Sequence, residues 1–391
     1  MFSSRLPAAL GPNALSRAVD ALRRSGVALI DLTETNPTTV DLPDTGDDLA
    51  PLADDRARRY APDPRGLAEA RDAIAAEYAR RGASAPADRL VLTASTSEAY
   101  AWLFKLLCDP GDEVAVPQPS YPLFDLLTGL DAVQARPYLL DYHGRWSIDR
   151  SSLERALTAS TRAVLVVSPN NPTGSMLRAE DREWLVAACA ARGVAVIADE
   201  VFADYPLAPR TDACSLMGET RALTFVLGGL SKSAGLPQVK LGWIAVSGPE
   251  ALASAALERL DIISDTYLSV STPVQVGAAR LIERGRRRRA AIAARVGGNL
   301  AALRAAVHDH PAVTLREPEG GWSAVLEVPA TTTDEALALT LLDTAHVVVH
   351  PGYFFDFTGG AFLVVSLLPR PDVFAEGVRR LLPIAGRGVS S

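Results

Sequence analysis

The stretch Ala163–Gly174 reads AVLVVSPNNPTG, an unbroken apolar run that ends in a loop of serine, proline, asparagine and glycine. Similar short apolar runs recur along the middle of the chain, and segments with helical spacing, such as 98–107 and 179–192, separate them. Short apolar strands that alternate with helices are typical of a mostly parallel sheet covered by helices on both faces. The predicted strands are Leu90–Thr93, Glu113–Pro117, Ala163–Ser168, Val194–Asp199, Thr224–Leu227 and Leu241–Val246.

Polar side chains follow three of these strands. The first loop contains Asn171, the next strand ends at Asp199, and the strand after that leads into the glycine-rich segment Gly228–Gly235 around Lys232. Since the carboxyl ends of parallel strands meet at one edge of a sheet, where ligands bind in such folds, these groups should lie together. The sequence therefore predicts one site that contains an amide, a carboxylate and a lysine.

Lysine is rare in this chain. Only Lys105, Lys232 and Lys240 occur among 39 basic residues, and all the others are arginines. A primary amine can lose its proton and attack a carbonyl group, which a guanidinium cannot do. Lys232 is therefore the candidate nucleophile, whereas Lys105, inside an apolar helical pattern, is interpreted as a solvated helix residue.

The pattern changes after residue 275. Residues 276–306 predict one long helix, with Gly297-Gly298 as the position where it could break. Three shorter strands follow, so we expect a second, smaller α+β domain. The predicted division is a large domain at 46–284 and a small domain made of 1–45 and 285–391. Within these segments, the predicted strands are Ala324–Val328, His346–His350 and Phe362–Leu367, and Asn13 with Leu15, Val19 and Leu22 predicts a capped amphipathic helix.

Composition excludes several classes of protein. The chain has 391 residues, of which 48% are hydrophobic and 22% charged, as in globular proteins large enough for two domains. A net charge of −7 argues against nucleic-acid binding, and we interpret the arginine-rich run 284–289 as a solvated helix face. The sequence contains no stretch of 18 apolar residues without a charge, so it predicts no membrane span. The three cysteines and the five scattered histidines do not have the spacing of a metal site. We expect a cytoplasmic protein.

Six pieces of the chain, taken in order, resemble the aminotransferase class I/II family, the fold type I enzymes that depend on pyridoxal phosphate. The resemblance implies an α/β fold, with a large domain whose mostly parallel sheet lies between helices and a smaller α+β domain. It also implies pyridoxal 5'-phosphate as cofactor, and an amino acid and a 2-oxo acid as substrates. The matching pieces are Tyr60 with Gly66 and Arg71, Thr93–Ala99, Pro119–Tyr121, Asn171–Gly174, Asp199–Phe202, and Ser231-Lys232 with Lys240.

The resemblance assigns roles to the residues of the predicted site. Lys232 would hold the cofactor as a Schiff base and then move the substrate proton. Asp199 would pair with the pyridine nitrogen, Asn171 would donate to the phenolate oxygen, and Tyr121 would stack on the ring. Capping a helix is the alternative role for Asp199, and an ordinary half-buried aromatic is the alternative for Tyr121.

The same resemblance implies how the phosphate is held. Ser95, Thr96 and Ser97 begin a helix after a strand and would bind the phosphate with backbone N–H groups and hydroxyls, although Ser97 could simply cap that helix. The resemblance also places Ser231, directly before Lys232, among the cofactor-binding residues. Tyr60 would reach the phosphate of the neighbouring subunit, which implies a homodimer with a shared active site.

Four positions depart from the family pattern. Phe202 stands where a tyrosine usually donates to the phenolate, so the cofactor–lysine linkage should keep its proton to a higher pH. Gly229 replaces a serine or threonine that binds phosphate, and Lys240 replaces an arginine. Val364 stands where the family carries the arginine that binds the substrate carboxylate.

The substrate carboxylate therefore needs another partner. Arg370, between two prolines, is the nearest arginine after Val364, and Asn36 could add an amide donor. A surface position is the alternative for Arg370. We predict Arg370 and Asn36 as substrate residues, with a charge-assisted contact worth roughly 10–150-fold in binding.

Three functions remain open on the residues alone. An aminotransferase that transfers an amino group through Lys232 is the first. A pyridoxal-phosphate-dependent lyase, which eliminates a β substituent on the same fold, is the second, and the changes at Phe202 and Val364 favour it. A ligand-sensing domain fused to a transcription factor is the third, and the absence of a helix-turn-helix pattern before residue 30 disfavours it.

Overall fold

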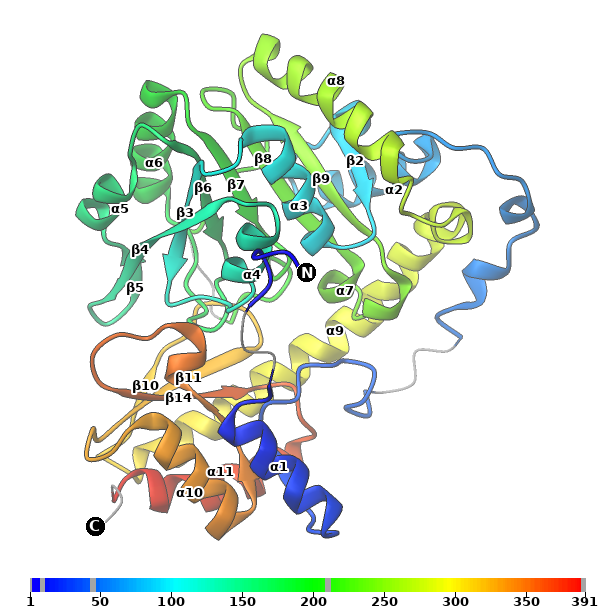
Figure 1. Cartoon of the computed structure of the whole chain (residues 1–391). Coiled ribbons are helices and arrows are strands. Elements are labelled where there is room, and N and C mark those ends of the chain that lie inside the picture. The colour runs from blue at the N-terminus through cyan, green and yellow to red at the C-terminus, as the bar shows by residue number, and fades with distance from the viewer. Residues whose placement is uncertain (1, 8–10, 43–46, 208–211, 388–391) are drawn as a thin grey trace.

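The computed structural model describes residues 2–7, 11–42, 47–207 and 212–387, and places two sheets one above the other (Figure 1). Residues 90–247 contribute the eight described strands of the larger sheet, and residues 314–366 contribute the four strands of a smaller one. The helix α9 (Thr272–His308) runs alongside both parts and joins them.

The larger sheet is mostly parallel, as predicted. Its strand order is β2-β9-β8-β7-β6-β3-β4-β5, where β9 is antiparallel to both of its neighbours and β5 to β4. The carboxyl ends of β2, β3, β4, β6, β7 and β8 therefore lie at one edge. The strands are β2 (Leu90–Thr93), β3 (Glu113–Gln118), β4 (Gln134–Tyr142), β5 (Trp146–Ile148), β6 (Thr161–Val167), β7 (Ala195–Asp199), β8 (Thr224–Gly229) and β9 (Gly242–Ser247).

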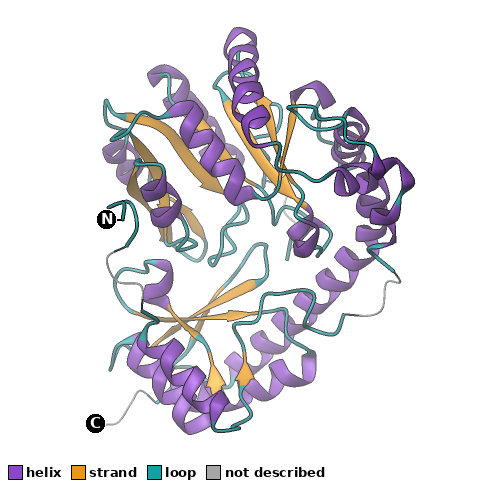
Figure 2. Ribbon diagram, turned by 45° about the vertical axis from the view of Figure 1, so that its right-hand side comes forward, coloured by secondary structure: helices purple, strands orange, loops and turns teal. Residues whose placement is uncertain are grey.

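Helices cover both faces of this sheet (Figure 2). One apolar cluster joins its strands to α2, α5, α6 and α9, and another joins them to α3, α4 and α8. Because both faces are buried, the central strands are apolar at consecutive positions rather than at alternate ones. The helices are α2 (Ala68–Arg80), α3 (Thr96–Leu107), α4 (Phe124–Leu130), α5 (Arg150–Ala156), α6 (Ala179–Arg192), α7 (Leu230–Ser233) and α8 (Glu250–Tyr267).

The smaller sheet has the order β10-β11-β14-β13 and is antiparallel. On one face it packs against α9, α10 and α11, and its other face looks toward the larger sheet (Figure 1). The chain start joins this part, because α1 packs on α10 and β1 pairs with β12. The elements are α1 (Ala14–Arg24), β1 (Ile30–Asp31), β10 (Thr314–Arg316), β11 (Ser323–Val328), α10 (Asp334–Ala345), β12 (Val347–Val348), β13 (His350–Pro351), β14 (Ala361–Ser366) and α11 (Pro371–Ala385).

The structure corrects two expectations about α9. The helix is continuous through Gly297-Gly298. A Cβ atom at either glycine would have no neighbour within 4 Å, so no close contact at this point bends or ends the helix. The arginine run is only partly a solvated face: Arg284, Arg286 and Arg287 are exposed, but Arg286 and Arg289 donate to Glu77 of α2, and Arg289 also donates to Asp204. In length and composition α9 could cross a membrane, but it packs on α2 and α11 and carries these ion pairs.

Neither predicted domain boundary coincides with the end of a described helix or strand. The boundary between residues 284 and 285 falls inside α9, and the boundary between 45 and 46 lies outside the described residues. The division into 46–284 and the two flanking segments therefore stays a prediction. The predicted N-terminal helix is α1, and the side chain of Asn13 caps it by accepting from Ser16 N at 2.7 Å.

Candidate active site

The carboxylate expected at the end of β7 is buried and fixed by hydrogen bonds. Asp199 accepts from the hydroxyl of Tyr100 at 2.7 Å and from the backbone N–H of Val201 at 3.1 Å. Burial raises the pKa of Asp199, and the bond from Tyr100, the bond from Val201 and the charge of Lys232 oppose that rise. A buried carboxylate of this kind is stable when a cation or several donors face it.

The lysine lies in α7, directly after β8. Its Nζ atom is 5.3 Å from the ring centre of Phe202 and 4.9 Å from that of Trp322. Burial lowers the pKa of Lys232 to about 8, and the charge of Asp199 opposes the change. The hydroxyl of Tyr205 donates to the carbonyl of Lys232 at 2.6 Å and so holds the lysine turn in place.

The two asparagines after β6 have different surroundings. The side chain of Asn170 is buried and satisfied, because it accepts from Ser120 and donates to Pro119 O and Thr173. The side chain of Asn171 instead faces the smaller sheet, where Ser323 Oγ donates to its Oδ1 at 3.2 Å. That contact occupies the carbonyl oxygen of Asn171 and leaves its amide group to donate to a ligand.

The start of α3 supplies an anion-binding helix terminus. Ser95 is the N-cap residue, and its side chain accepts from Glu98 N at 3.2 Å while Glu98 Oε2 accepts from Ala94 N at 2.6 Å. This capping box corrects the suggestion that Ser97 caps the helix. The N–H groups of Thr96 and Ser97 at the first turn have no intrahelical partner by geometry, so they can bind a phosphate.

Small residues on three adjacent strands let the start of α3 lie close to the lysine turn. Thr93, Gly242 and Gly229 are register partners across β2, β9 and β8. A side chain at Gly242 would lie 3.0 Å from Thr93 Oγ1 and 3.1 Å from Ser95. The absence of side chains at the two glycines therefore lets the strands and the α3 terminus approach each other.

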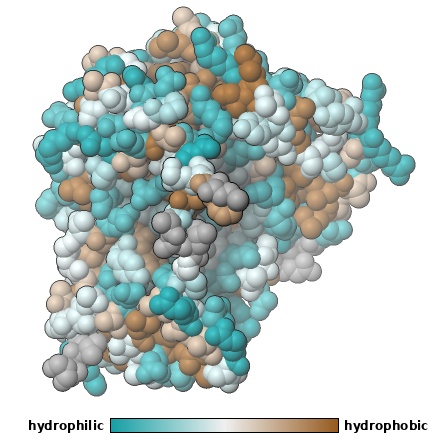
Figure 3. All heavy atoms as spheres, viewed as in Figure 1, coloured by the Kyte–Doolittle hydropathy of each residue, from teal (hydrophilic) through white to brown (hydrophobic). Residues whose placement is uncertain are grey.

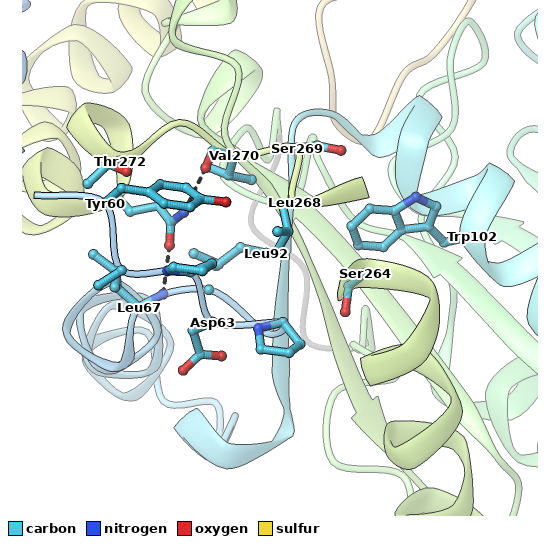
Figure 4. A pocket seen from close by; sticks show the side chains of 15 residues that line it. Tyr60, Asp63, Leu67, Leu92, Trp102, Ser264, Leu268, Ser269, Val270 and Thr272 are labelled. Carbon is cyan, nitrogen blue, oxygen red and sulfur yellow. Dashed lines mark hydrogen bonds between the residues drawn. The ribbon is translucent and has the colours of Figure 1, made fainter. Parts of the chain in front are cut away.

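The remaining predicted cofactor residues lie at the rim. Ser231 is in α7 beside Lys232, and Tyr121 follows β3 with 47% of its surface exposed. Lys240 is exposed, in a left-handed conformation (φ 59°) two residues before β9. Tyr60 is 71% exposed and lines a pocket with Trp102 and Gln275 (Figure 4), and Lys232 is not among the residues that line this pocket.

The predicted substrate residues are only partly supported. Asn36 is exposed, and its Oδ1 accepts from the backbone and hydroxyl of Thr38. The guanidinium of Arg370 donates to Asp372 and Asp41, and its side chain is 50% exposed. These contacts favour the alternative, a surface position, and the substrate role of Arg370 stays a prediction.

Sequence reasoning missed two aromatic residues of the site, Tyr100 and Trp322. Tyr100 lies one turn after Thr96, on the inward face of α3, and helical spacing from the predicted phosphate residues could have found it. Trp322 follows two glycines before β11 and packs edge-on against Phe202 and Tyr205. No local pattern links Trp322 to Lys232, because the contact joins residues 90 positions apart.

These groups fit pyridoxal 5'-phosphate. The buried Asp199 carboxylate can face a protonated ring nitrogen, the Asn171 amide can donate to the ring oxygen, and the N-terminus of α3 can hold the phosphate. The amine with a lowered pKa can react with the aldehyde. Each donor matches one functional group of the cofactor.

The chain is similar to known aminotransferases. The alanine aminotransferase of Mycobacterium tuberculosis is 29% identical over 304 residues, which cover 75% of this chain and 70% of that protein. The glutamate-pyruvate aminotransferase AlaA of Haemophilus influenzae is 30% identical over 216 residues, covering 54% and 53%. The structure of an alanine aminotransferase from Pyrococcus furiosus has a TM-score of 0.89 at 23% identity, covering 99% and 100%.

The family assignment rests on most of the chain. Residues 27–371 match the family described as aminotransferase class I and II. That range contains both sheets and every predicted cofactor residue. The protein is therefore a member of the aminotransferase class I and II family, with the α/β fold of the fold type I enzymes.

Proposed function

We propose that this aminotransferase uses pyridoxal 5'-phosphate, bound at Lys232, to move an amino group between an amino acid and a 2-oxo acid. The observation that carries the proposal is a lysine whose pKa burial lowers to about 8, beside a buried carboxylate and at the edge where six strands end. A reactive amine next to an ionisable carboxylate is what this cofactor requires.

When bound, pyridoxal phosphate supplies an electron-accepting ring next to the substrate Cα. At neutral pH a fraction of Lys232 is neutral, so its Nζ can accept the proton from Cα and return it to the product. Asp199, oriented by Tyr100, would keep a ring nitrogen protonated. The rings of Phe202 and Trp322 exclude water from the amine.

The substrates to test first follow from the names of the relatives. Alanine, glutamate and pyruvate occur in the names of the two curated proteins described above. We propose a neutral amino acid such as alanine as donor and a 2-oxo acid as acceptor, and we propose the cytoplasm as the location of the reaction.

We also propose a homodimer that shares its active sites. Tyr60 and Ile262 are each 71% exposed, and apolar side chains gather on this face around the end of α8 (Figure 3). Tyr60 lies over a pocket where Gln275 accepts from Leu67 N and donates to Val270 O (Figure 4). An exposed aromatic ring on an ordered loop suits contact with a second copy of the chain.

The test is a half-reaction with one substrate at a time. The purified protein with pyridoxal phosphate is mixed with L-alanine or L-glutamate, and pyridoxamine phosphate is measured. Its formation together with the 2-oxo acid supports transamination, whereas release of ammonia with the aldehyde cofactor retained identifies a lyase. Lys232→Ala should abolish the reaction, and Lys105→Ala, which removes an exposed ion pair with Asp131, should not change it.

A further inference from the structure

The inner face of the smaller sheet forms the wall of the site opposite the cofactor residues. Ser323 at the start of β11 contacts Asn171, and Trp322 just before it contacts Lys232. Two residues further along the strands, on the same face, Val325 pairs in register with Val364. This wall is apolar at the position where the family pattern predicts a cation.

His350 extends the same row of residues. It is the register partner of Val364 on β13, so its side chain lies on the same face, directly beside that valine. Its ring is 5.6 Å from that of Phe354 and 5.7 Å from that of Phe355, measured between centres. The carbonyl of Phe355 accepts from Ser120 N at 3.0 Å, which fastens this segment to the loop that carries Tyr121.

The imidazole of His350 has unused hydrogen-bonding capacity. Its Nδ1 atom is buried and has no hydrogen-bond partner among the residues that the structure describes. Burial lowers the pKa of His350, and the nearby carboxylate of Asp31 opposes that change. A buried ring nitrogen without a partner costs free energy unless a ligand supplies one.

The arginines near this wall already have partners. Arg316 lies in the same row, opposite Val325, but it is paired with Glu327 and stacks on the ring of Tyr142 at 4.3 Å. Arg370 is held by Asp372 and Asp41. Among the described residues of this wall, the Nδ1 of His350 and the indole Nε1 of Trp322 are buried without a hydrogen-bond partner. His350 is the one that lies directly beside Val364, where the family pattern has its arginine.

We propose that His350 binds the α-carboxylate of the substrate and thereby selects amino acids over simple amines. The proposal rests on the aminotransferase function proposed above. An imidazole N–H that donates to a carboxylate forms a charge-assisted bond, worth roughly 10–150-fold in affinity. Val325, Val364 and Phe355 keep water from that contact and favour an uncharged substrate side chain.

The experiment compares two donors that differ only in the carboxylate. L-Alanine and ethylamine are offered to the wild-type holoenzyme and to His350→Leu, and the half-reaction is followed by the cofactor's absorbance. For L-alanine, His350→Leu should raise KM at least tenfold while kcat stays within threefold of the wild-type value. For ethylamine, kcat/KM should change less than threefold.

Two further variants separate substrate binding from folding. His350→Gln retains an amide donor and should recover part of the KM for L-alanine, and His308→Leu, an exposed change at the end of α9, should leave both donors unaffected. Circular dichroism and the cofactor spectrum should match the wild type. Binding of 2-aminoisobutyrate, followed by the change in absorbance, should weaken at least tenfold in His350→Leu.

The possible results separate the role of His350 from the proposed aminotransferase function. Equal losses for L-alanine and ethylamine, or an unchanged KM for L-alanine, would overturn the role of His350 and leave the aminotransferase function intact. If the wild-type holoenzyme converted no amino acid, the proposed function itself would fail, and this inference with it. A tenfold loss confined to the donors with a carboxylate supports the assignment.

Discussion

The two walls of the candidate site are built in different ways. On the wall from the larger sheet, Asp199, Lys232 and Asn171 follow directly from strand ends, and hydrogen bonds fix the Asp199 carboxylate and the Asn171 carbonyl oxygen. On the wall from the smaller sheet, valines and phenylalanines dominate around His350, whose Nδ1 has no hydrogen-bond partner among the described residues. The contrast indicates that the first wall presents several positioned polar groups to the cofactor, whereas the second presents a mostly apolar surface to the substrate.

The largest expected effect concerns the buried amine of the cofactor wall. In the cofactor-free protein, the pKa of Lys232 is about 8 instead of 10.5, so protonation is disfavoured in the folded state by about 3 kcal/mol below pH 8. Between pH 8 and 10.5 the unfolded chain holds this proton and the folded chain does not, so the wild type gains stability as pH rises. Lys232→Met should therefore be more stable than wild type at pH 7.

Urea unfolding of both proteins at pH 7 and pH 10 measures this difference. The advantage of Lys232→Met should shrink at the higher pH, because the wild-type amine is then neutral in the folded state. A stability difference that is the same at both pH values would show that the lysine is not desolvated as described.

The second prediction concerns the buried Asp199 carboxylate and its hydrogen bond from the Tyr100 hydroxyl. Tyr100→Phe removes the 2.7 Å bond to Asp199, which further raises the pKa of that carboxyl. The half-reaction rate should fall roughly 10–100-fold, and more at pH 6 than at pH 8, because more of Asp199 is then protonated. Tyr138→Phe is the matched control, since it removes a buried tyrosine bond to Leu165 O away from the site and should leave the rate unchanged.

Phe202 contacts both Lys232 and Trp322, where the two walls meet. Phe202→Tyr should place a hydroxyl near the ring oxygen of the cofactor and lower the pH at which the cofactor–lysine linkage loses its proton. An absorbance titration of the holoenzyme measures the midpoint. An unmoved midpoint would mean that the ring of Phe202 does not face that oxygen.

The smallest effect is expected at the surface of the small domain. Arg370→Ala breaks exposed ion pairs with Asp372 and Asp41, which are worth little in water. KM for the amino-acid donor should change less than threefold. A tenfold increase would instead return Arg370 to the substrate site and weaken the case for His350.

The sequence predicted the cofactor wall because its residues are local. Asp199 ends an apolar strand, Lys232 follows the next one, and parallel strand order brings such ends together without knowledge of side-chain packing. The predicted strand at 90–93 has the bounds of β2, and the predicted strand at 194–199 begins one residue before β7. The strand β4 was missed, because it is partly exposed and contains Arg136 and Pro137 rather than an apolar run.

The substrate wall could not be predicted in the same way. Val364 marked a missing arginine, but proximity in the sequence suggested Arg370, which the turn into α11 carries to the surface. The position of His350 beside Val364 depends on the register of β13 and β14, set by packing between segments that a local pattern does not connect. Trp322 was missed for the same reason, whereas helical spacing from Thr96 could have found Tyr100.

The central claim is that Lys232 carries the cofactor, and chemical reduction tests it most directly. The protein with pyridoxal phosphate is treated with borohydride, digested and mapped by mass spectrometry. The label should be found on the peptide that contains Lys232, and Lys232→Ala should take up none while keeping its fold by circular dichroism. A label on Lys105 or Lys240 in the wild-type protein would contradict the account.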